Sequence, residues 1–368
     1  MAEPLSVLVL GGDGIGPEVV AAGVRLLEAV AAREGLRLLL EEDLLHGAAW
    51  EAHGTFCRDE TVAKARTADA VLVGSVGGVQ WDHCMPGGTP AQKDGLMRLR
   101  QELDVFAGLR PARAYDALID QTPFRPELVR GADVMVVREL CGGAFFGEPR
   151  GITAMSGGGE RGIDTTVYTT AEISRIARTG FELARRRRGR LVSADKANVM
   201  ETYALWRRVV GEIGAAEYPD VELTHLYADN AVYQLCRQPR NFDVILGDNL
   251  FGDILSDQAG ALAGSLGMLP SASLSAVPKP GSRIRPGIFE PVHGTAPDIA
   301  GQGIANPIGA ILSVAMMFDY GFAMPAIARR IERAVEWALA GGLRTPDLGG
   351  STTTAQMTDA IIAGYDPS

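Results

Sequence analysis

Short apolar runs rich in β-branched residues alternate with longer amphipathic stretches from the start of the chain. The clearest strand-like runs span residues 5–10, 70–75, 132–138 and 241–247. Stretches with apolar positions at i, i+3, i+4 and i+7 span 17–32, 171–188, 199–213 and 324–340. Strands that alternate with helices in this way indicate an α/β fold with at least one mainly parallel sheet.

The size and charge of the chain exclude several classes of protein. Its 368 residues suffice for two domains, and 46% hydrophobic with 22% charged residues excludes a largely disordered chain. A net charge of −10 gives no bulk attraction to nucleic acid or to an anionic membrane. The apolar runs are too short to span a bilayer, and the N-terminus lacks the basic region of a signal peptide. Four scattered cysteines without CxxC spacing predict reduced thiols in a cytoplasmic protein.

Three segments look irregular or unusually charged. The glycine-rich residues 156–162 and the β-rich residues Thr165–Thr170 predict a protruding hairpin. Residues Ser271–Gly287 are rich in Pro, Gly and Ser, which predicts a surface loop. The basic run at 184–188 lies where a helix ends, so it complements the helix dipole better than it fits a nucleic-acid patch.

Glycines between the first strand and the first helix invite comparison with a dinucleotide-binding turn. Residues Gly11–Gly16 read GGDGIG and are followed at once by Pro17, so their spacing is GxGxG and not GxGxxG. Glu41 and Glu42 lie near the place of a ribose-binding acid, which is weak support. We expect a tight strand-to-helix turn and not a standard Rossmann site.

Two aspartates carry the strongest chemical signal. Asp253 and Asp257 are four residues apart, so a helix beginning near Phe251 places both carboxylates on one face. Such a pair repels unless hydrogen bonds or a cation offset the charge, and Mg²⁺ or Mn²⁺ suits oxygen ligands. Asp248 is a further candidate, either as a ligand or as the cap of that helix.

Basic residues stand at the ends of apolar stretches. Lys196 follows a predicted strand, where α/β sheets place ligands, and a lysine there can transfer protons. Arg100, Arg110 and Arg138 would together suit a di- or tricarboxylate if the fold brings them into one cleft.

Eight long motifs resemble those of the β-decarboxylating dehydrogenases of the isocitrate/isopropylmalate type. They are LGGDGIGPEV, VGSVGGVQWD, LRQELDVFAGLRPAR, VVRELCGGAFFGEPRG, SADKANVMET, GDNLFGDILSD, FEPVHGTAPDIAGQGIANPIGAILS and DLGGSTTT. They span nearly the whole chain. The stretch Arg138–Glu148 is similar to that of the isopropylmalate branch.

This resemblance implies two α/β domains around a central cleft. Residues 1–105 and 264–368 would form a discontinuous nucleotide-binding domain, and 106–263 a substrate and dimerisation domain. The segment near 157–170 would be an intersubunit arm of a homodimer with shared active sites.

The implied reaction is NAD-dependent, metal-assisted oxidative decarboxylation of 3-isopropylmalate or a closely related 3-substituted malate. Mg²⁺ or Mn²⁺ would be held by Asp253 and Asp257 of one subunit and Asp229 of its partner. Lys196, also from the partner, would promote removal of the 2-hydroxyl proton. The residues implied to bind the substrate are Arg100, Arg110, Arg138, Asp229, Leu96, Met97 and Val199.

The resemblance also places the cofactor. The implied NAD-binding residues are Gly74, Ser75, Gly77, Gly78, His293, Gly294, Thr295, Ala296, Pro297, Asp298, Ile299 and Asn306. Asp298 would accept hydrogen bonds from a ribose hydroxyl and repel a 2′-phosphate, which favours NAD over NADP.

The sequence departs from the family at the position of a catalytic tyrosine, which is Phe145 here. Cys141 stands where the family has Thr, and the segment Ser271–Gly287 is longer than its counterpart. Phenylalanine has no exchangeable proton, so three functions compete. They are the 3-isopropylmalate dehydrogenase reaction of leucine synthesis, oxidation of a different 3-substituted malate in specialised metabolism, and a weakly active binding protein. The retained charges at Lys196, Asp229, Asp253 and Asp257 argue against the last.

Overall fold

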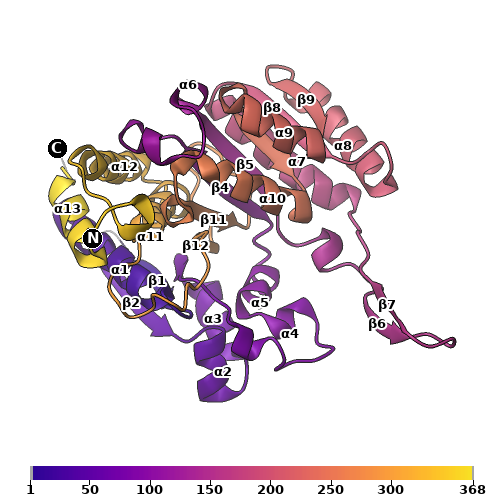
Figure 1. Ribbon diagram of the computed structural model, residues 1–368, viewed down its shortest axis with the longest axis horizontal. Coiled ribbons are helices and arrows are strands. Elements are labelled where there is room, and N and C mark those ends of the chain that lie inside the picture. The colour runs from indigo at the N-terminus through magenta and orange to yellow at the C-terminus, as the bar shows by residue number, and fades with distance from the viewer. Residues whose placement is uncertain (1–2, 367–368) are drawn as a thin grey trace.

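A ten-stranded mixed sheet forms the centre of the computed structural model, which describes residues 3–366 (Figure 1). Its strand order is β2-β1-β3-β12-β11-β4-β5-β10-β8-β9. These strands are β1 Leu5–Leu10, β2 Leu38–Asp43, β3 Ala70–Val73, β4 Ala107–Arg113, β5 Asp133–Glu139, β8 Arg190–Asp195, β9 Glu222–Tyr227, β10 Val244–Gly247, β11 Pro270–Leu274 and β12 Gly287–Pro291.

Helices connect and cover these strands. They are α1 Gly16–Glu34, α2 Gly47–His53, α3 Asp59–Thr67, α4 Pro90–Lys93, α5 Gly95–Glu102, α6 Pro126–Val129, α7 Thr170–Arg186, α8 Glu201–Glu217, α9 Ala228–Arg237, α10 Asn249–Gly260, α11 Ile308–Met316, α12 Pro325–Ala340 and α13 Thr354–Gly364. A π-helical turn at Met317–Gly321 follows α11. Within residues 3–366, no helix is long and apolar enough to cross a membrane.

The expected α/β class is confirmed, and the topology is not that of a standard Rossmann fold. The other neighbours in the sheet pair parallel, whereas β4 is antiparallel to β5 and β11, and β11 is antiparallel to β12. Strands from residues 1–105 and 264–368 fill one half of the sheet, and those from 106–263 fill the other. The division into two domains at these boundaries stays a prediction.

Strands β4 and β5 present different side chains on their two faces. Arg110 pairs with Val136 and Gly108 with Arg138, so both arginines point to one face. Helix α10 packs there, since a Cβ on Gly252 would lie 2.8 Å from the Arg138 side chain. On the opposite face, Gly180 of α7 packs against leucines of β8 and β10.

Two predicted segments, the protruding hairpin and the surface loop, have different bounds in the structure. The hairpin is formed by β6 Gly151–Ala154 and β7 Glu160–Ile163, and it extends from the body (Figure 1). The residues after it return to the core, where Tyr168 is buried. The Tyr168 hydroxyl oxygen accepts a hydrogen bond from the Asn249 backbone N–H at 2.9 Å. The predicted loop Ser271–Gly287 is a loop only in its middle, because Ser271–Leu274 lies in the buried strand β11 and Gly287 begins β12.

Candidate active site

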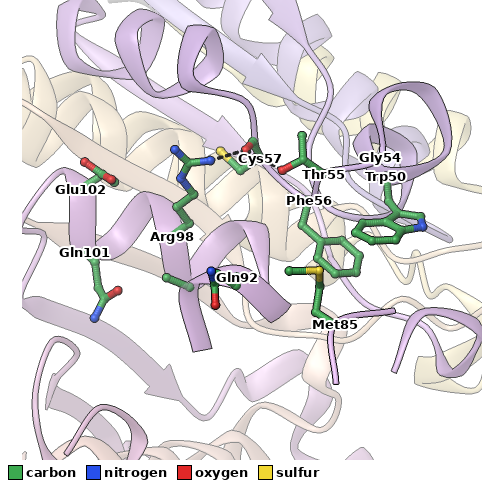
Figure 2. Close-up of a pocket in the computed structure, with 11 residues that line it drawn as sticks. Trp50, Gly54, Thr55, Phe56, Cys57, Met85, Gln92, Arg98, Gln101 and Glu102 are labelled. Atoms are coloured by element: carbon green, nitrogen blue, oxygen red, sulfur yellow. Dashed lines mark hydrogen bonds between the residues drawn. The ribbon is translucent and has the colours of Figure 1, made fainter. Parts of the chain in front are cut away.

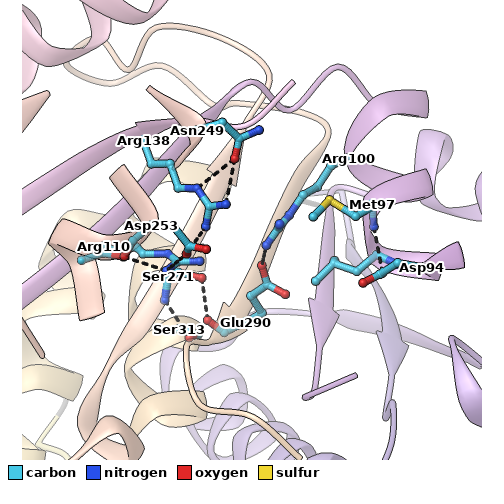
Figure 3. Close-up of polar contacts among 12 residues, drawn as sticks. Asp94, Met97, Arg100, Arg110, Arg138, Asn249, Asp253, Ser271, Glu290 and Ser313 are labelled. Atoms are coloured by element: carbon cyan, nitrogen blue, oxygen red, sulfur yellow. Dashed lines mark hydrogen bonds and ion pairs between the residues drawn. The ribbon is translucent and has the colours of Figure 1, made fainter. Parts of the chain in front are cut away.

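Two arginines converge on one carboxylate at the carboxyl end of β5. Arg138 is buried, with its Nη1 donating to Asp253 and its Nε and Nη2 donating to Asn249 Oδ1 at 3.1 and 2.7 Å (Figure 3). Arg110 donates from Nη1 to the same Asp253 oxygen at 3.1 Å and to Ser256 Oγ at 2.7 Å. The structure therefore brings these predicted residues together in one chain.

Asp257 completes what we call the arginine–aspartate cluster, namely Arg110, Arg138, Asp253 and Asp257. Its Oδ1 lies 3.5 Å from Arg110 Nη1, one helical turn beyond Asp253 on α10. Asp248 is the cap of this helix, since its Oδ1 accepts from the Phe251 N–H at 2.7 Å. The capping alternative for Asp248 is thus the observed one.

Like charges crowd within the cluster. Burial, followed by the nearby Arg110 and Arg100 charges, lowers the pKa of the Arg138 guanidinium to about 9, which leaves it charged at neutral pH. Burial also raises the pKa of the Asp257 carboxyl, and the adjacent Asp253 charge adds to the rise. A dianionic ligand would relieve the first effect and a cation the second.

Arg100 approaches this region from α5 but is held by a residue that the sequence analysis missed. Its Nη2 donates to Glu290 Oε1 at 2.6 Å, and both side chains are buried (Figure 3). The Nε of Arg100 is also buried, and it has no hydrogen-bond partner within residues 3–366. Glu290 could have been predicted from the sequence, since it is a charged residue within the otherwise apolar strand β12. A buried carboxylate needs a cationic partner.

Phe145 lies at the cluster. Its ring centroid is 5.5 Å from the Arg138 guanidinium carbon, so the ring stacks beside the charge. The Phe145 backbone carbonyl accepts from Arg150 Nη1. Phe145 therefore lies beside the predicted substrate arginine Arg138. Its side chain has no proton to donate to a substrate.

Lys196 and Asp229 form a second group, which we call the lysine–aspartate pair. Lys196 follows β8, Asp229 lies in the first turn of α9, and Lys196 Nζ donates to Asp229 Oδ1. This hydrogen bond lowers the pKa of the Asp229 carboxyl. Val199, in the same region, is 69% exposed. Within residues 3–366, neither a hydrogen bond nor an ion pair joins this pair to the arginine–aspartate cluster.

The two faces of α5 differ. Leu96 is buried and Met97 is half-buried on this helix beside Arg100. Arg98, Gln101 and Glu102 instead line a separate cavity of about 440 Å³ next to Trp50 and Phe56 (Figure 2). Arg98 Nη1 donates there to the Cys57 carbonyl at 2.5 Å. The predicted site residues do not line this cavity.

The glycine turn after β1 packs against both predicted cofactor segments. A Cβ on Gly12, at φ 73°, would lie 2.2 Å from the Ser75 carbonyl oxygen, and one on Gly14, at φ 56°, would lie 2.1 Å from that of Thr295. The Asp13 N–H donates to the Ser75 carbonyl at 2.7 Å, and Asp13 Oδ2 accepts from the Gly77 N–H at 2.9 Å. Because these glycines lack a Cβ, the backbone carbonyls of Ser75 and Thr295 can approach the turn closely, as expected for a structural turn.

The segment His293–Ile299 offers unpaired polar groups. His293 is buried, its Nδ1 lies 2.9 Å from the Gly294 carbonyl, and its Nε2 has no partner within residues 3–366. Burial lowers the pKa of His293, so the ring is neutral at pH 7. Asp298 is exposed, whereas the Asn306 amide is already held by Asp347 at 3.0 Å. An orphaned imidazole nitrogen and a free carboxylate fit the recognition of a polar nucleotide.

Helix α10 carries two carboxylates that suit a divalent cation. Among the residues that the structure describes, no three His, Cys, Asp or Glu side chains gather to hold a metal ion. Asp253 and Asp257 offer carboxylate oxygens of the kind that Mg²⁺ and Mn²⁺ prefer, and such ions commonly complete their coordination with water, substrate oxygens or a further carboxylate. Asp229 is 69% exposed at its side chain and is free to meet another chain.

Comparisons with known proteins agree on one family. The model of the isocitrate/isopropylmalate dehydrogenase family matches residues 6–361. Proteins named 3-isopropylmalate dehydrogenase from Cereibacter sphaeroides and Ruegeria pomeroyi are each 53% identical, with 100% of both chains covered. The crystal structure of isocitrate dehydrogenase from Methylococcus capsulatus superposes with a TM-score of 0.85 at 33% identity, covering 98% of this chain and 99% of the other.

Proposed function

The chain belongs to the isocitrate/isopropylmalate dehydrogenase family, and on that premise we propose that it oxidises and decarboxylates 3-isopropylmalate with NAD and Mg²⁺ or Mn²⁺. It is an oxidoreductase that decarboxylates its substrate, as its family and relatives indicate. The relatives' name assigns it to leucine biosynthesis. We propose that it acts in the cytoplasm as a homodimer with shared active sites.

The convergence of Arg110 and Arg138 on Asp253 carries this proposal. Asp253 accepts hydrogen bonds from both guanidinium groups and offsets part of their positive charge. A substrate with two carboxylates would take over both guanidinium groups, and Asp253 would then be released to a cation. Arg100, held in place by Glu290, would contribute the third guanidinium through its unpaired Nε.

The proposed cation ligands are Asp253 and Asp257 of one subunit and Asp229 of the partner subunit. When bound, the cation supplies Lewis-acid stabilisation of negative charge that develops on the substrate oxygens. Lys196 would stand beside Asp229 in the completed site and promote removal of the 2-hydroxyl proton, which its Nζ can accept only after the ammonium has given its own proton to solvent. Leu96 and Met97, with Val199 of the partner subunit, would enclose the apolar isopropyl group.

NAD, which accepts the hydride when bound, would lie along Gly74, Ser75, Gly77 and Gly78 on one side and His293–Ile299 with Asn306 on the other. His293 Nε2 and the Asp298 carboxylate are the groups with hydrogen-bonding capacity to spare. A carboxylate at Asp298 favours a ribose hydroxyl and disfavours a phosphate, which is why we propose NAD.

Phe145 leaves the enol without the family's tyrosine as proton donor. Its stacking on Arg138 keeps the ring at the substrate arginines. A water molecule or another residue would have to donate that proton. The identity of 53% to proteins named 3-isopropylmalate dehydrogenase favours a tolerated variant over a different 3-substituted malate or a binding protein.

Steady-state turnover tests this function. NADH formation would be followed with 3-isopropylmalate, 3-methylmalate, isocitrate and malate, each with NAD or NADP, and released CO₂ would be measured in parallel. We expect the highest kcat/KM with 3-isopropylmalate and NAD, one CO₂ for each NADH, and dependence on added Mg²⁺ or Mn²⁺ after chelation. Faster turnover of another malate, or preference for NADP, would contradict the proposal.

A further inference from the structure

A cavity of about 420 Å³ lies on the face of β4 and β5 opposite to the arginine–aspartate cluster. Pro111 and Arg113 of β4 and Asp133 and Met135 of β5 line it, and they alternate with the residues that face the cluster. A second cavity of about 460 Å³ shares Met135 and several charged side chains with the first and reaches Lys279. Both volumes fall in the range of about 300–1,000 Å³ that is usual for small-molecule sites.

Besides Arg187, four charged side chains line both cavities from the two halves of the sheet. They are Arg186 at the end of α7, Asp319 in the π-helical turn, and Arg329 and Glu332 on α12. Within residues 3–366, no hydrogen bond or ion pair holds any of these four side chains. In contrast, the neighbouring Arg187 is neutralised by Asp133 and Asp243, each at 2.9 Å.

Two of these unpaired charges, those of Asp319 and Glu332, are only partly solvated, whereas Arg186 and Arg329 are exposed. Asp319 and Glu332 are half-buried, and burial raises the pKa of both carboxyls, while Arg186 and Arg329 act on Asp319 in the opposite direction. Polar groups that lose water without gaining a partner cost free energy, so a ligand with matching charges would be favoured. The π-helical turn that presents Asp319 is a rare conformation found frequently at functional sites.

Apart from Arg113, Asp133, Arg187 and two tyrosines, the remaining lining of the first cavity is apolar. It includes Met268, Leu269, Leu312, Ala315 and Met316. An anion alone would meet Asp319 and Glu332, and a cation alone would meet Arg186 and Arg329. A molecule that carries both charges and an apolar group matches every part of the wall.

We propose that these joined cavities bind an α-amino acid with an aliphatic side chain. The α-carboxylate would pair with Arg186 and Arg329, the α-ammonium with Asp319 and Glu332, and the side chain would pack on Leu312 and Met316. This site is distinct from the dehydrogenase site and stands independently of the function proposed above. Its occupant would contact elements from both halves of the sheet.

Calorimetry and thermal unfolding of the full protein test the binding. L-leucine is the probe, and the two analogues are 4-methylpentanoate, which lacks the ammonium group, and 3-methylbutylamine, which lacks the carboxylate. We expect saturable binding of L-leucine with a rise in Tm, and affinities at least about tenfold lower for each analogue. Absence of saturable L-leucine binding, or equal affinity for either analogue, would overturn the proposal.

Variants test the assignment of residues. Arg329→Gln and Asp319→Asn should each weaken L-leucine binding by about tenfold or more and leave turnover of 3-isopropylmalate in place. The matched control is Arg333→Gln, an exposed change on the same helix outside both cavities. Glu332→Gln provides a second carboxylate test if Asp319→Asn does not fold. Unchanged L-leucine affinity in the folded variants would contradict the proposed contacts.

Discussion

The arginine–aspartate cluster and the lysine–aspartate pair differ in how far one chain has assembled them. In the cluster, the side chains of Arg138 and Arg110 are 3% and 14% exposed, and Asp253 links them. In the pair, Lys196 and Asp229 are 31% and 69% exposed, and each is held by the other. Both groups carry predicted site residues, yet only the cluster is fixed by the surrounding fold.

This difference suggests separate roles for the two groups, namely substrate binding and proton transfer. Buried guanidinium groups with two or more partners are positioned before substrate arrives, which favours binding of a dicarboxylate in one orientation. We propose that the half-buried Lys196 and the exposed Asp229 meet a second chain, where they would add the proton-transfer group and a further cation ligand. The account therefore assigns binding to the cluster and proton transfer to the pair.

The largest expected effect separates these two roles. Lys196→Ala should lower kcat for 3-isopropylmalate by about 10²–10⁴-fold, because a positioned proton-transfer group contributes this much, and should change substrate KM far less. Initial-rate kinetics over a range of substrate concentrations measure both constants. The control is Lys279→Ala, an exposed lysine on a loop. A Lys196→Ala enzyme with normal kcat would remove Lys196 from the chemistry.

A change in the cluster should act on binding instead. Arg138→Gln should lower kcat/KM by about 10–150-fold, since hydrogen bonds to charged groups contribute about 1.5–3 kcal/mol. Arg130→Gln, at an exposed pair with Asp116, is the matched control and should have no effect. Unfolding curves of both variants separate lost binding from lost structure. An Arg138→Gln protein that folds and binds substrate normally would contradict the role of the cluster.

Phe145→Tyr adds a proton donor beside the cluster. We expect kcat with 3-isopropylmalate to rise by up to about 10²-fold, the low end for a general acid, because a water molecule or another residue would already serve in the wild type. The kcat of this variant with other substituted malates should stay below its kcat with 3-isopropylmalate. A fall in turnover of 3-isopropylmalate together with a loss on a different, preferred malate would instead favour a specialised substrate.

The smallest effect concerns the cofactor. Asp298→Ala should raise KM for NAD by about 2–12-fold, which corresponds to one hydrogen bond of about 0.5–1.5 kcal/mol, and leave KM for NADP unchanged or lower. Asp359→Ala, an exposed aspartate on α13, is the control. Equal losses with both cofactors would show that Asp298 does not read the ribose.

The sequence predicted the elements whose signals are local. The helical stretch 171–188 became α7 Thr170–Arg186, which begins at a capping box of Thr169 and Glu172. The spacing of Asp253 and Asp257 predicted their common face, and the structure adds that arginines occupy it. Strand Pro270–Leu274 was missed because PSASL has little β propensity, and tertiary pairing with β4 and β12 determines it.

The partners of the predicted site residues could not be predicted in the same way. Asn249 and Glu290 hold Arg138 and Arg100 across 111 and 190 residues of sequence, so their contacts depend on the complete sheet. The unpaired charges of Arg186, Asp319, Arg329 and Glu332 come from three elements, namely α7, the π-helical turn and α12, and no motif in the sequence joins them. These residues differ from other polar residues of the chain in their burial and in their partners, and both properties depend on the complete fold.

Subunit mixing tests most directly the claim that the cluster and the pair form one site across two chains. Homodimers of Lys196→Ala and of Asp253→Ala should each be inactive, because every site lacks one group. Heterodimers purified with two different tags should regain activity, since one of their two sites combines an intact cluster with an intact pair. The account predicts turnover of 3-isopropylmalate in verified heterodimers, and inactivity of those heterodimers would contradict it.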